Sequence, residues 1–265
     1  MSKKSSKSQQ VKDLFDAAHR EGKLSRASLA TLDVHDLGAA IQAGLGVAVD
    51  DVESSEVVLV SMMPDDSGSI RFSGNAAAVR DGHNLVLEAL GACKQRDDIF
   101  VHNRYLNGTV LYPYTPVADA VPMTRHNYDP NQGTPLYDQT VVLLGTVLAK
   151  AQEFAQNGVP VRTITLLITD GADEHSARAG AGEVASLVRD MLADEIHIIA
   201  AMGIDNGTTD FHKVFCAMGI PPAWILTPQN SAGEVRKAFQ VFSQSAVRAS
   251  QSAIFSSSAL GGFAN

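Results

Sequence analysis

V-V-L-V-S-M-M-P-D-D-S-G-S, residues 57 to 69, is the stretch that decides how this chain folds. Its first half is a run of β-branched and aliphatic residues after a polar cluster at residues 50–56, which predicts a strand buried on both faces. Its second half places one carboxylate and two hydroxyls at alternate positions, Asp65, Ser67 and Ser69, and Gly68 permits a sharp turn. A loop that leaves the carboxyl end of a buried strand can turn these three oxygens toward one point.

Hard oxygen ligands that converge on one point suit Mg²⁺ or Mn²⁺ better than zinc, because no soft ligand is present. Asp, Ser and Gly also make up ordinary exposed turns. The loop by itself therefore leaves a metal site and a plain turn equally open.

Outward from this stretch, strands alternate with helices. The patterns predict helices at 75–92, 136–156, 182–193, 209–218 and 231–250, and strands at 98–105, 109–114, 162–169, 195–202 and 224–226. Asn107-Gly108 predicts a hairpin between two of the strands, whereas the other connections predict parallel crossover units. The expected fold class is α/β: a doubly wound, mostly parallel sheet with one antiparallel edge strand and helices on both faces.

The predicted organisation has four parts. Residues 1–10 form a disordered Ser/Lys tail, and residues 11–55 form a helical extension, with helices at 11–22 and 28–45, that packs against the main domain. Residues 56–250 form the main domain, and residues 251–265 form a flexible Ser/Ala/Gly-rich tail.

Composition excludes several classes of protein. The formal charge of −8 and the pI of about 5.4 supply no field for holding phosphate backbones, which disfavours nucleic-acid binding. Cys93 and Cys216 lack the spacing of a thiolate zinc site or a disulfide framework. The N-terminus has no apolar signal core and no run approaches a membrane span, so we expect a cytoplasmic protein.

Two further polar motifs lie where they could join the first loop. Gly133-Thr134 opens the helix predicted at 136–156, with Thr134 and Pro135 resembling an N-cap and a first helical residue, and Thr169-Asp170-Gly171 follows a buried strand. Loops at the carboxyl ends of parallel strands share one crevice, so the three motifs can meet there.

In this order and context, the motifs resemble the von Willebrand factor A domain and its metal-ion-dependent adhesion site over about residues 56 to 248. The resemblance implies that Ser67 and Ser69 ligate Mg²⁺ or Mn²⁺ directly and that Thr134 joins or leaves the inner shell with conformational state. It implies that Asp65 and Asp170 act largely through bound water and through hydrogen bonds to the hydroxyls. The neighbouring rim, which would contact a partner, comprises Asp66, Gly133 and Asp173.

The sequence departs from the family pattern just before Asp65. Pro64 cannot donate to the sheet and fixes its own φ, so the strand is expected to end or bulge there. A displaced Asp65 would make Asp66 a substitute, although only Asp65 has the D-x-S-x-S spacing.

The function favoured by these residues is a non-enzymatic, intracellular module that captures a carboxylate of a partner protein through the metal. The alternatives are a metal-dependent phosphoester hydrolase, for which Asp66 and Asp173 are the near candidates as general base, and an RNA-binding protein of the same fold family. Asp173, Glu174 and His175 could form a second metal site or supply a general base, but an acidic solvated loop is the favoured interpretation. His83 and His102 are interpreted as core or surface histidines. The general format is similar to bacterial stand-alone proteins of this family associated with tellurium resistance, a stress response, and with kinase and phosphatase partners.

Overall fold

A six-stranded sheet runs through the middle of the computed structural model, which describes residues 7–33, 37–252, 255 and 257–263. The spatial order is β3-β2-β1-β4-β5-β6, and all neighbouring pairs are parallel except β2 and β3. The strands are β1 (Val57–Pro64), β2 (Ile99–Arg104), β3 (Val110–Pro116), β4 (Val161–Thr169), β5 (His197–Gly203) and β6 (Ile225–Leu226). The predicted α/β fold class, with one antiparallel strand at an edge, is confirmed.

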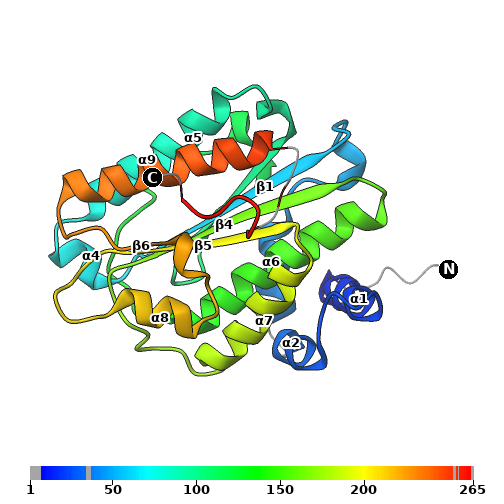
Figure 1. Ribbon diagram of the computed structural model, residues 1–265, viewed down its shortest axis with the longest axis horizontal. Helices are drawn as coiled ribbons and strands as arrows, with labels where there is room; N and C mark the ends of the chain where they lie inside the picture. The colour runs from blue at the N-terminus through cyan, green and yellow to red at the C-terminus, as the bar shows by residue number, and fades with distance from the viewer. Residues whose placement is uncertain (1–6, 34–36, 253–254, 256, 264–265) are drawn as a thin grey trace.

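Helices cover both faces of the sheet. In Figure 1, α5 and α9 lie side by side over one face, and α6 and α7 lie over the other. The helices of this part are α4 (Gly68–Phe72), α5 (Ala76–Gly91), α6 (Leu136–Gln156), α7 (Ala181–Ala193), α8 (Phe211–Ala217) and α9 (Ala232–Gln251). Short 3₁₀ turns lie at Val49–Asp51, Arg96–Asp98, Val117–Asp119 and Pro222–Trp224.

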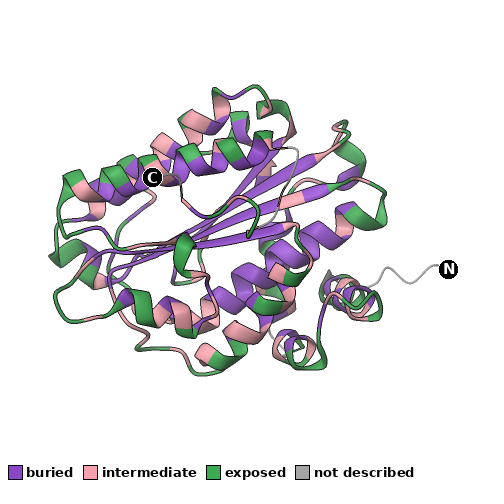
Figure 2. Ribbon diagram, in the orientation of Figure 1, coloured by how far each residue is buried: buried purple, intermediate pink, exposed green. Residues whose placement is uncertain are grey.

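The central strands are buried on both faces, as their continuous apolar sequences predict. Every residue of β1 is buried, and β4 is buried except for the half-buried Arg162. Figure 2 shows this buried centre between helices that expose their outer sides. No helix within the described ranges has both the length and the apolar character needed to span a bilayer.

Three helices precede the sheet: α1 (Lys7–Arg20), α2 (Arg26–Leu32) and α3 (Leu37–Leu45). The single helix predicted for 28–45 is therefore wrong: α2 ends at Leu32, where the Asp33 N–H still bonds the Leu29 carbonyl, and a separate helix starts at Leu37. Apolar residues keep helical spacing on both sides of the break, so the sequence pattern alone predicts one continuous helix. Helix α1 begins inside the tail predicted for residues 1–10, of which residues 1–6 lie outside the described part.

These helices pack against α6 and the edge of the sheet, and buried polar groups fix them there. The Arg104 guanidinium of β2 donates to the Ala40 carbonyl of α3, and the buried Lys150 of α6 donates to the Val47 carbonyl. The Val47 N–H donates to the Tyr114 carbonyl of β3 at 2.9 Å. Of the N-terminal helices, α3 thus reaches the sheet at β3, whereas α1 packs on α3 and α6, and α2 packs on α6 and α7.

The segment predicted as a flexible tail, residues 251–265, has described residues that contact the sheet edge. The Phe263 ring packs against Trp224 with centroids 5.3 Å apart, and its N–H donates to the Ala223 carbonyl. The Trp224 Nε1–H donates to the Ser257 carbonyl at 3.1 Å. These contacts hold the described part of the tail against the turn Pro222–Trp224, which leads into the edge strand β6.

Buried histidines make the stability of the fold sensitive to acid. His197 of β5 is 1% exposed, and its Nδ1 shares a 2.6 Å hydrogen bond with the Thr163 hydroxyl. Burial, assisted by the charge of Lys23, lowers the pKa of His197 to about 3. Burial likewise lowers the pKa of His102 to about 3 and that of His83 to about 4. These two were predicted as core or surface histidines, and both lie in the core.

We expect His197→Asn to flatten the pH dependence of folding. An unfolded histidine takes up a proton below about pH 6.5, whereas folded His197 stays neutral. The stabilisation of the folded protein by neutral His197 is therefore complete above about pH 6.5 and is lost as the pH falls. From pH 7.5 to pH 5, wild type should lose about 2 kcal/mol more free energy of unfolding than the variant, measured by urea titration. The exposed His126→Asn is the control, and equal losses in wild type and His197→Asn would contradict the expectation.

Candidate metal centre

The candidate site lies where the direction of the chain through the sheet reverses. From β1 the chain passes to β2 and β3 on one side, and then returns to β4 on the other side of β1. Asp65 follows β1 and Asp170 follows β4, so both leave the carboxyl ends of adjacent parallel strands. Ligands bind at this kind of switch point in open α/β sheets, because the connections diverge there and leave a crevice.

Four of the five predicted metal residues line one hollow of about 520 Å³: Ser67, Ser69, Thr134 and Asp170. The fifth, Asp65, lies just beneath and is fully buried. The hydroxyl oxygens of Ser67 and Ser69 are 2.8 Å apart, and the Ser69 hydroxyl donates to Asp170 Oδ1. The motifs that the sequence separates by up to about a hundred residues therefore meet.

Asp65 holds the loop in shape from below. Its Oδ1 accepts the Ser67 backbone N–H at 2.7 Å, and its Oδ2 accepts the Thr169 hydroxyl at 2.6 Å. Strand β1 ends at Pro64, as predicted, but without a bulge: Pro64 keeps its register opposite Ile168, and the Asp65 N–H donates to the Ile168 carbonyl at 2.9 Å. The proline therefore leaves Asp65 in line with the strand.

Asp170 is held from both sides of the hollow. Its Oδ2 accepts the Ser73 hydroxyl at 3.2 Å, and its backbone carbonyl accepts the Asn206 side-chain amide at 2.8 Å. Ser73 in turn accepts a hydrogen bond from Asn75, which also donates to Asn230 before α9. Ser73, Thr169 and Asn206 are thus supporting residues that carry no motif of their own in the sequence.

The Thr134 loop is fixed by His175. The Thr134 N–H donates to His175 Nδ1 at 2.9 Å, and the Thr134 carbonyl accepts the backbone N–H groups of Glu174 and His175 at 3.1 and 3.3 Å. A Cβ on Gly133 would lie 2.9 Å from the His175 ring, so glycine is what lets the ring approach. The prediction that Thr134 is the N-cap of α6 and Pro135 its first helical residue is wrong: Pro135 is the N-cap, without a side-chain bond, and the helix begins at Leu136.

Two of the predicted rim residues turn away from the hollow. Asp66 is 3% exposed, and its Oδ1 accepts the Asn107 N–H of the hairpin turn at 2.9 Å. The Asp173 carboxylate accepts the Tyr137 N–H at 3.2 Å and the Ser176 hydroxyl at 2.5 Å. Gly133 does line the hollow, together with Gln132, Glu174, His175 and Phe72.

The electrostatics of the site favour a cation. Burial raises the pKa of Asp65 to about 6, against the lowering effect of hydrogen bonds from Ser67 and Thr169. Burial also raises the pKa of Asp170, against bonds from Ser69 and Ser73. Among the described residues that line the hollow, none is lysine or arginine. Two poorly solvated carboxylates without a basic neighbour would be stabilised by a positive ion.

The donor set fits a hard divalent cation. No group of three or more His, Cys, Asp or Glu side chains that could hold a metal occurs in the part of the chain that the structure describes. The site depends instead on hydroxyl oxygens backed by carboxylates, which suits Mg²⁺ or Mn²⁺. A Cβ on Gly171 would lie 3.6 Å from Thr134 Oγ1 and 3.9 Å from Ser69 Oγ, so the glycine keeps open the space between these two oxygens.

The hydrogen bond from Thr134 to His175 gives a prediction. His175→Ala should weaken Mn²⁺ binding about tenfold, because the Thr134 N–H loses its acceptor and the loop is less firmly held. Isothermal titration calorimetry of the purified protein measures the change, with the exposed His212→Ala as control. Unchanged affinity in His175→Ala would show that the backbone bonds to the Thr134 carbonyl suffice.

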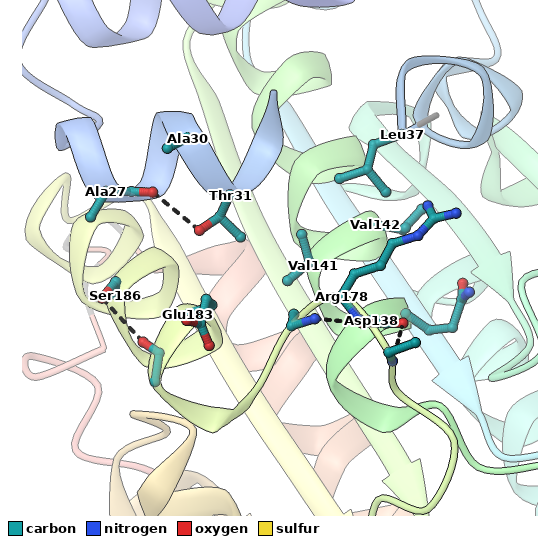
Figure 3. Close-up of a pocket in the computed structure, with 14 residues that line it drawn as sticks. Ala27, Ala30, Thr31, Leu37, Asp138, Val141, Val142, Arg178, Glu183 and Ser186 are labelled. Atoms are coloured by element: carbon teal, nitrogen blue, oxygen red, sulfur yellow. Dashed lines mark hydrogen bonds between the residues drawn. The ribbon is translucent and has the colours of Figure 1, made fainter. Parts of the chain in front are cut away.

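A larger hollow, about 710 Å³, lies elsewhere, between α2, α6 and α7. Figure 3 shows its lining, in which the Arg178 side chain extends toward Val142 and Leu37. Its carboxylates serve the fold: Asp138 accepts the backbone N–H groups of residues 177–179, and Glu183 accepts the Gly180 N–H at the start of α7. This hollow lies at the interface between the N-terminal helices and the rest of the chain.

Comparison with known proteins gives the fold. No protein-family model matches the sequence, and no curated protein matches it. One similar solved structure is the pilus adhesin SpaC from Lactobacillus rhamnosus GG in its open conformation, with a TM-score of 0.54 and 14% identity over 74% of this chain and 30% of that one. Another is the vWF domain of the type V pili tip protein Mfa5 from Porphyromonas gingivalis, with a TM-score of 0.51 and 10% identity over 72% of this chain and 95% of that one. This chain therefore spans less than a third of SpaC, and at these identities the likeness concerns the fold alone.

Proposed function

We propose that this chain, which has the von Willebrand factor A fold, binds a carboxylate of a protein partner through a divalent cation held at the candidate metal centre. The observation that carries the proposal is the meeting of Ser67, Ser69, Thr134 and Asp170 around one hollow, with Asp65 beneath it. Mg²⁺ or Mn²⁺ is the proposed ion, because every donor is an oxygen.

The roles of the residues follow from their contacts. Ser67 and Ser69 present neutral hydroxyl oxygens 2.8 Å apart, and Thr134 presents a third from the opposite loop. Asp170 accepts the Ser69 hydroxyl and so orients its lone pairs away from the carboxylate, while Asp65 fixes the Ser67 backbone. An ion held mainly by neutral hydroxyls keeps much of its charge, and it therefore attracts an outside carboxylate strongly.

A binding role is better supported than hydrolysis. A hydrolase that activates water at the ion needs a general base within reach of that water. Asp66 and Asp173, the two candidates from the sequence, do not line the hollow, and their carboxylates accept backbone N–H groups elsewhere. Of the other groups that line it, His175 accepts the Thr134 N–H through Nδ1, which leaves the exposed Glu174 as the base that a turnover assay would test. We therefore propose a non-enzymatic protein. We also propose a cytoplasmic location and a role in a bacterial stress response with kinase or phosphatase partners, and these two proposals rest on the sequence only.

Selection of a displayed random peptide library on the immobilised protein tests the proposal. In Mg²⁺ or Mn²⁺ the recovered peptides should be enriched in Asp or Glu and should elute with EDTA. Asp170→Ala should recover none of them, whereas Asp97→Ala, an exposed acidic residue before β2, should behave as wild type. Peptides that bind equally well in EDTA, or turnover of phosphoesters in the same metal, would overturn the proposal.

A further inference from the structure

One apolar side chain stands out on the surface beside the metal centre. Phe72 is 90% exposed, whereas the other large exposed apolar side chain among the described residues, Val121, is 46% exposed. Phe72 ends α4, the five-residue helix that starts at Gly68 within the metal-binding loop. A single exposed apolar side chain is common on protein surfaces, so what distinguishes Phe72 is its position beside the candidate metal centre.

The ring lies against the metal-binding loop. A Cβ built on Gly68 would be 3.5 Å from Phe72 Cε2 and 3.9 Å from Cδ2, so the ring folds back toward the start of its helix. Phe72 lines the same hollow as Ser67, Ser69 and Asp170. An apolar face therefore adjoins the oxygen cluster, on the side of α4.

The rest of the helix is committed to other contacts. Ile70 is fully buried beneath the loop, and the Arg71 guanidinium pairs with Asp129 on the surface. The remaining sides of the hollow are polar, from Gln132, Glu174, His175, Asn206 and Thr208. Phe72 is thus the one large apolar group among the described residues around the hollow.

We infer that Phe72 selects the partner: the site takes a protein segment in which the metal-binding Asp or Glu has an apolar side chain as its immediate neighbour. The carboxylate enters the hollow, and the neighbouring apolar side chain packs on the phenyl ring at the rim. This inference rests on the proposed function, since the carboxylate is what brings the segment to the site. Without the apolar contact the carboxylate alone would not discriminate among acidic peptides.

Three synthetic peptides test it: acetyl-Gly-Glu-Gly-amide, acetyl-Leu-Glu-Gly-amide and acetyl-Gly-Glu-Leu-amide, titrated into the full chain in Mn²⁺ and in EDTA. One leucine peptide should bind wild type about fivefold to tenfold more tightly than the glycine peptide, as expected for burial of one apolar side chain against a ring. In Phe72→Ser this ratio should fall to about one, whereas Val121→Ser should keep it. Calorimetry should show the same Mn²⁺ affinity in wild type and Phe72→Ser, which separates the rim contact from the metal site.

The outcomes distinguish the inference from the function on which it rests. If all three peptides bind equally and only in Mn²⁺, the metal-dependent function stands and the role of Phe72 is wrong. If Phe72→Ser keeps the preference for leucine, the ring is not the selecting group. If no peptide binds in a metal-dependent manner, the proposed function fails and the inference fails with it.

Discussion

Replacing Asp65 with asparagine should weaken Mn²⁺ or Mg²⁺ binding by at least about 100-fold without lowering the melting temperature of the metal-free protein. Asparagine keeps the shape of the side chain and an oxygen that can accept the Ser67 N–H, now made at 2.7 Å, but it removes the charge. Burial raises the pKa of Asp65 to about 6, so at pH 7 the carboxylate is still mostly ionised, but its charge is less well stabilised than that of an exposed aspartate unless a cation is present.

In Asp65→Asn the affinity for the metal ion should therefore fall while the stability of the metal-free protein does not. Calorimetric titration with Mn²⁺ gives the first quantity, and thermal unfolding in EDTA gives the second. Asp97→Asn, at an exposed position, is the matched control. A variant that lost stability in EDTA together with metal affinity would show that Asp65 serves the fold rather than the ion.

Gly46→Ala should destabilise the protein by at least about 3 kcal/mol. Gly46 follows α3 with φ of +61°, and a Cβ there would lie 2.0 Å from the Tyr114 carbonyl oxygen and 2.6 Å from the Tyr114 nitrogen. Both atoms belong to the backbone of β3, so neither can move aside cheaply. The Val47 N–H bond to the same carbonyl would be pushed apart as well.

Gly22 offers a matched control in the same N-terminal region. Its φ is +79°, but nothing lies within 4 Å of the position of a Cβ, so Gly22→Ala should cost only about 1 kcal/mol, the strain of the left-handed backbone. Chemical denaturation followed by circular dichroism measures both variants. Equal losses in the two variants would mean that the end of α3 moves freely away from β3.

The fold and the core of the site follow from the sequence for one physical reason. Buried parallel strands appear as uninterrupted apolar runs, and their carboxyl ends share one edge, so the sequence predicts that Asp65 and Asp170 can meet there. The structure makes their strands, β1 and β4, direct neighbours. The D-x-S-G-S spacing then predicts the two hydroxyls, which the structure places 2.8 Å apart.

Side-chain directions in the loops could not be predicted in the same way. Asp66 and Asp173 differ little in sequence context from the site residues, yet their carboxylates turn toward backbone N–H groups of Asn107 and Tyr137. The hydrogen bond between Thr134 and His175 links two loops that are far apart in the sequence and meet only in the folded protein. The one local hint of this contact in the sequence is Gly133, which leaves room for the His175 ring. The break between α2 and α3 was missed because apolar spacing persists across it.

The packing of α3 against α6 has a consequence for synthesis of the chain. Helix α3 contacts α1 and β3, which are made early, but the apolar side chains with which it faces α6, Ile41 among them, lack that partner until α6, which begins at Leu136, has left the ribosome. At translation rates of about 5–20 residues per second, these side chains stay uncovered on a nascent chain for on the order of ten seconds. The packing of the first helices of the protein is thus completed only after more than half of the chain has been made.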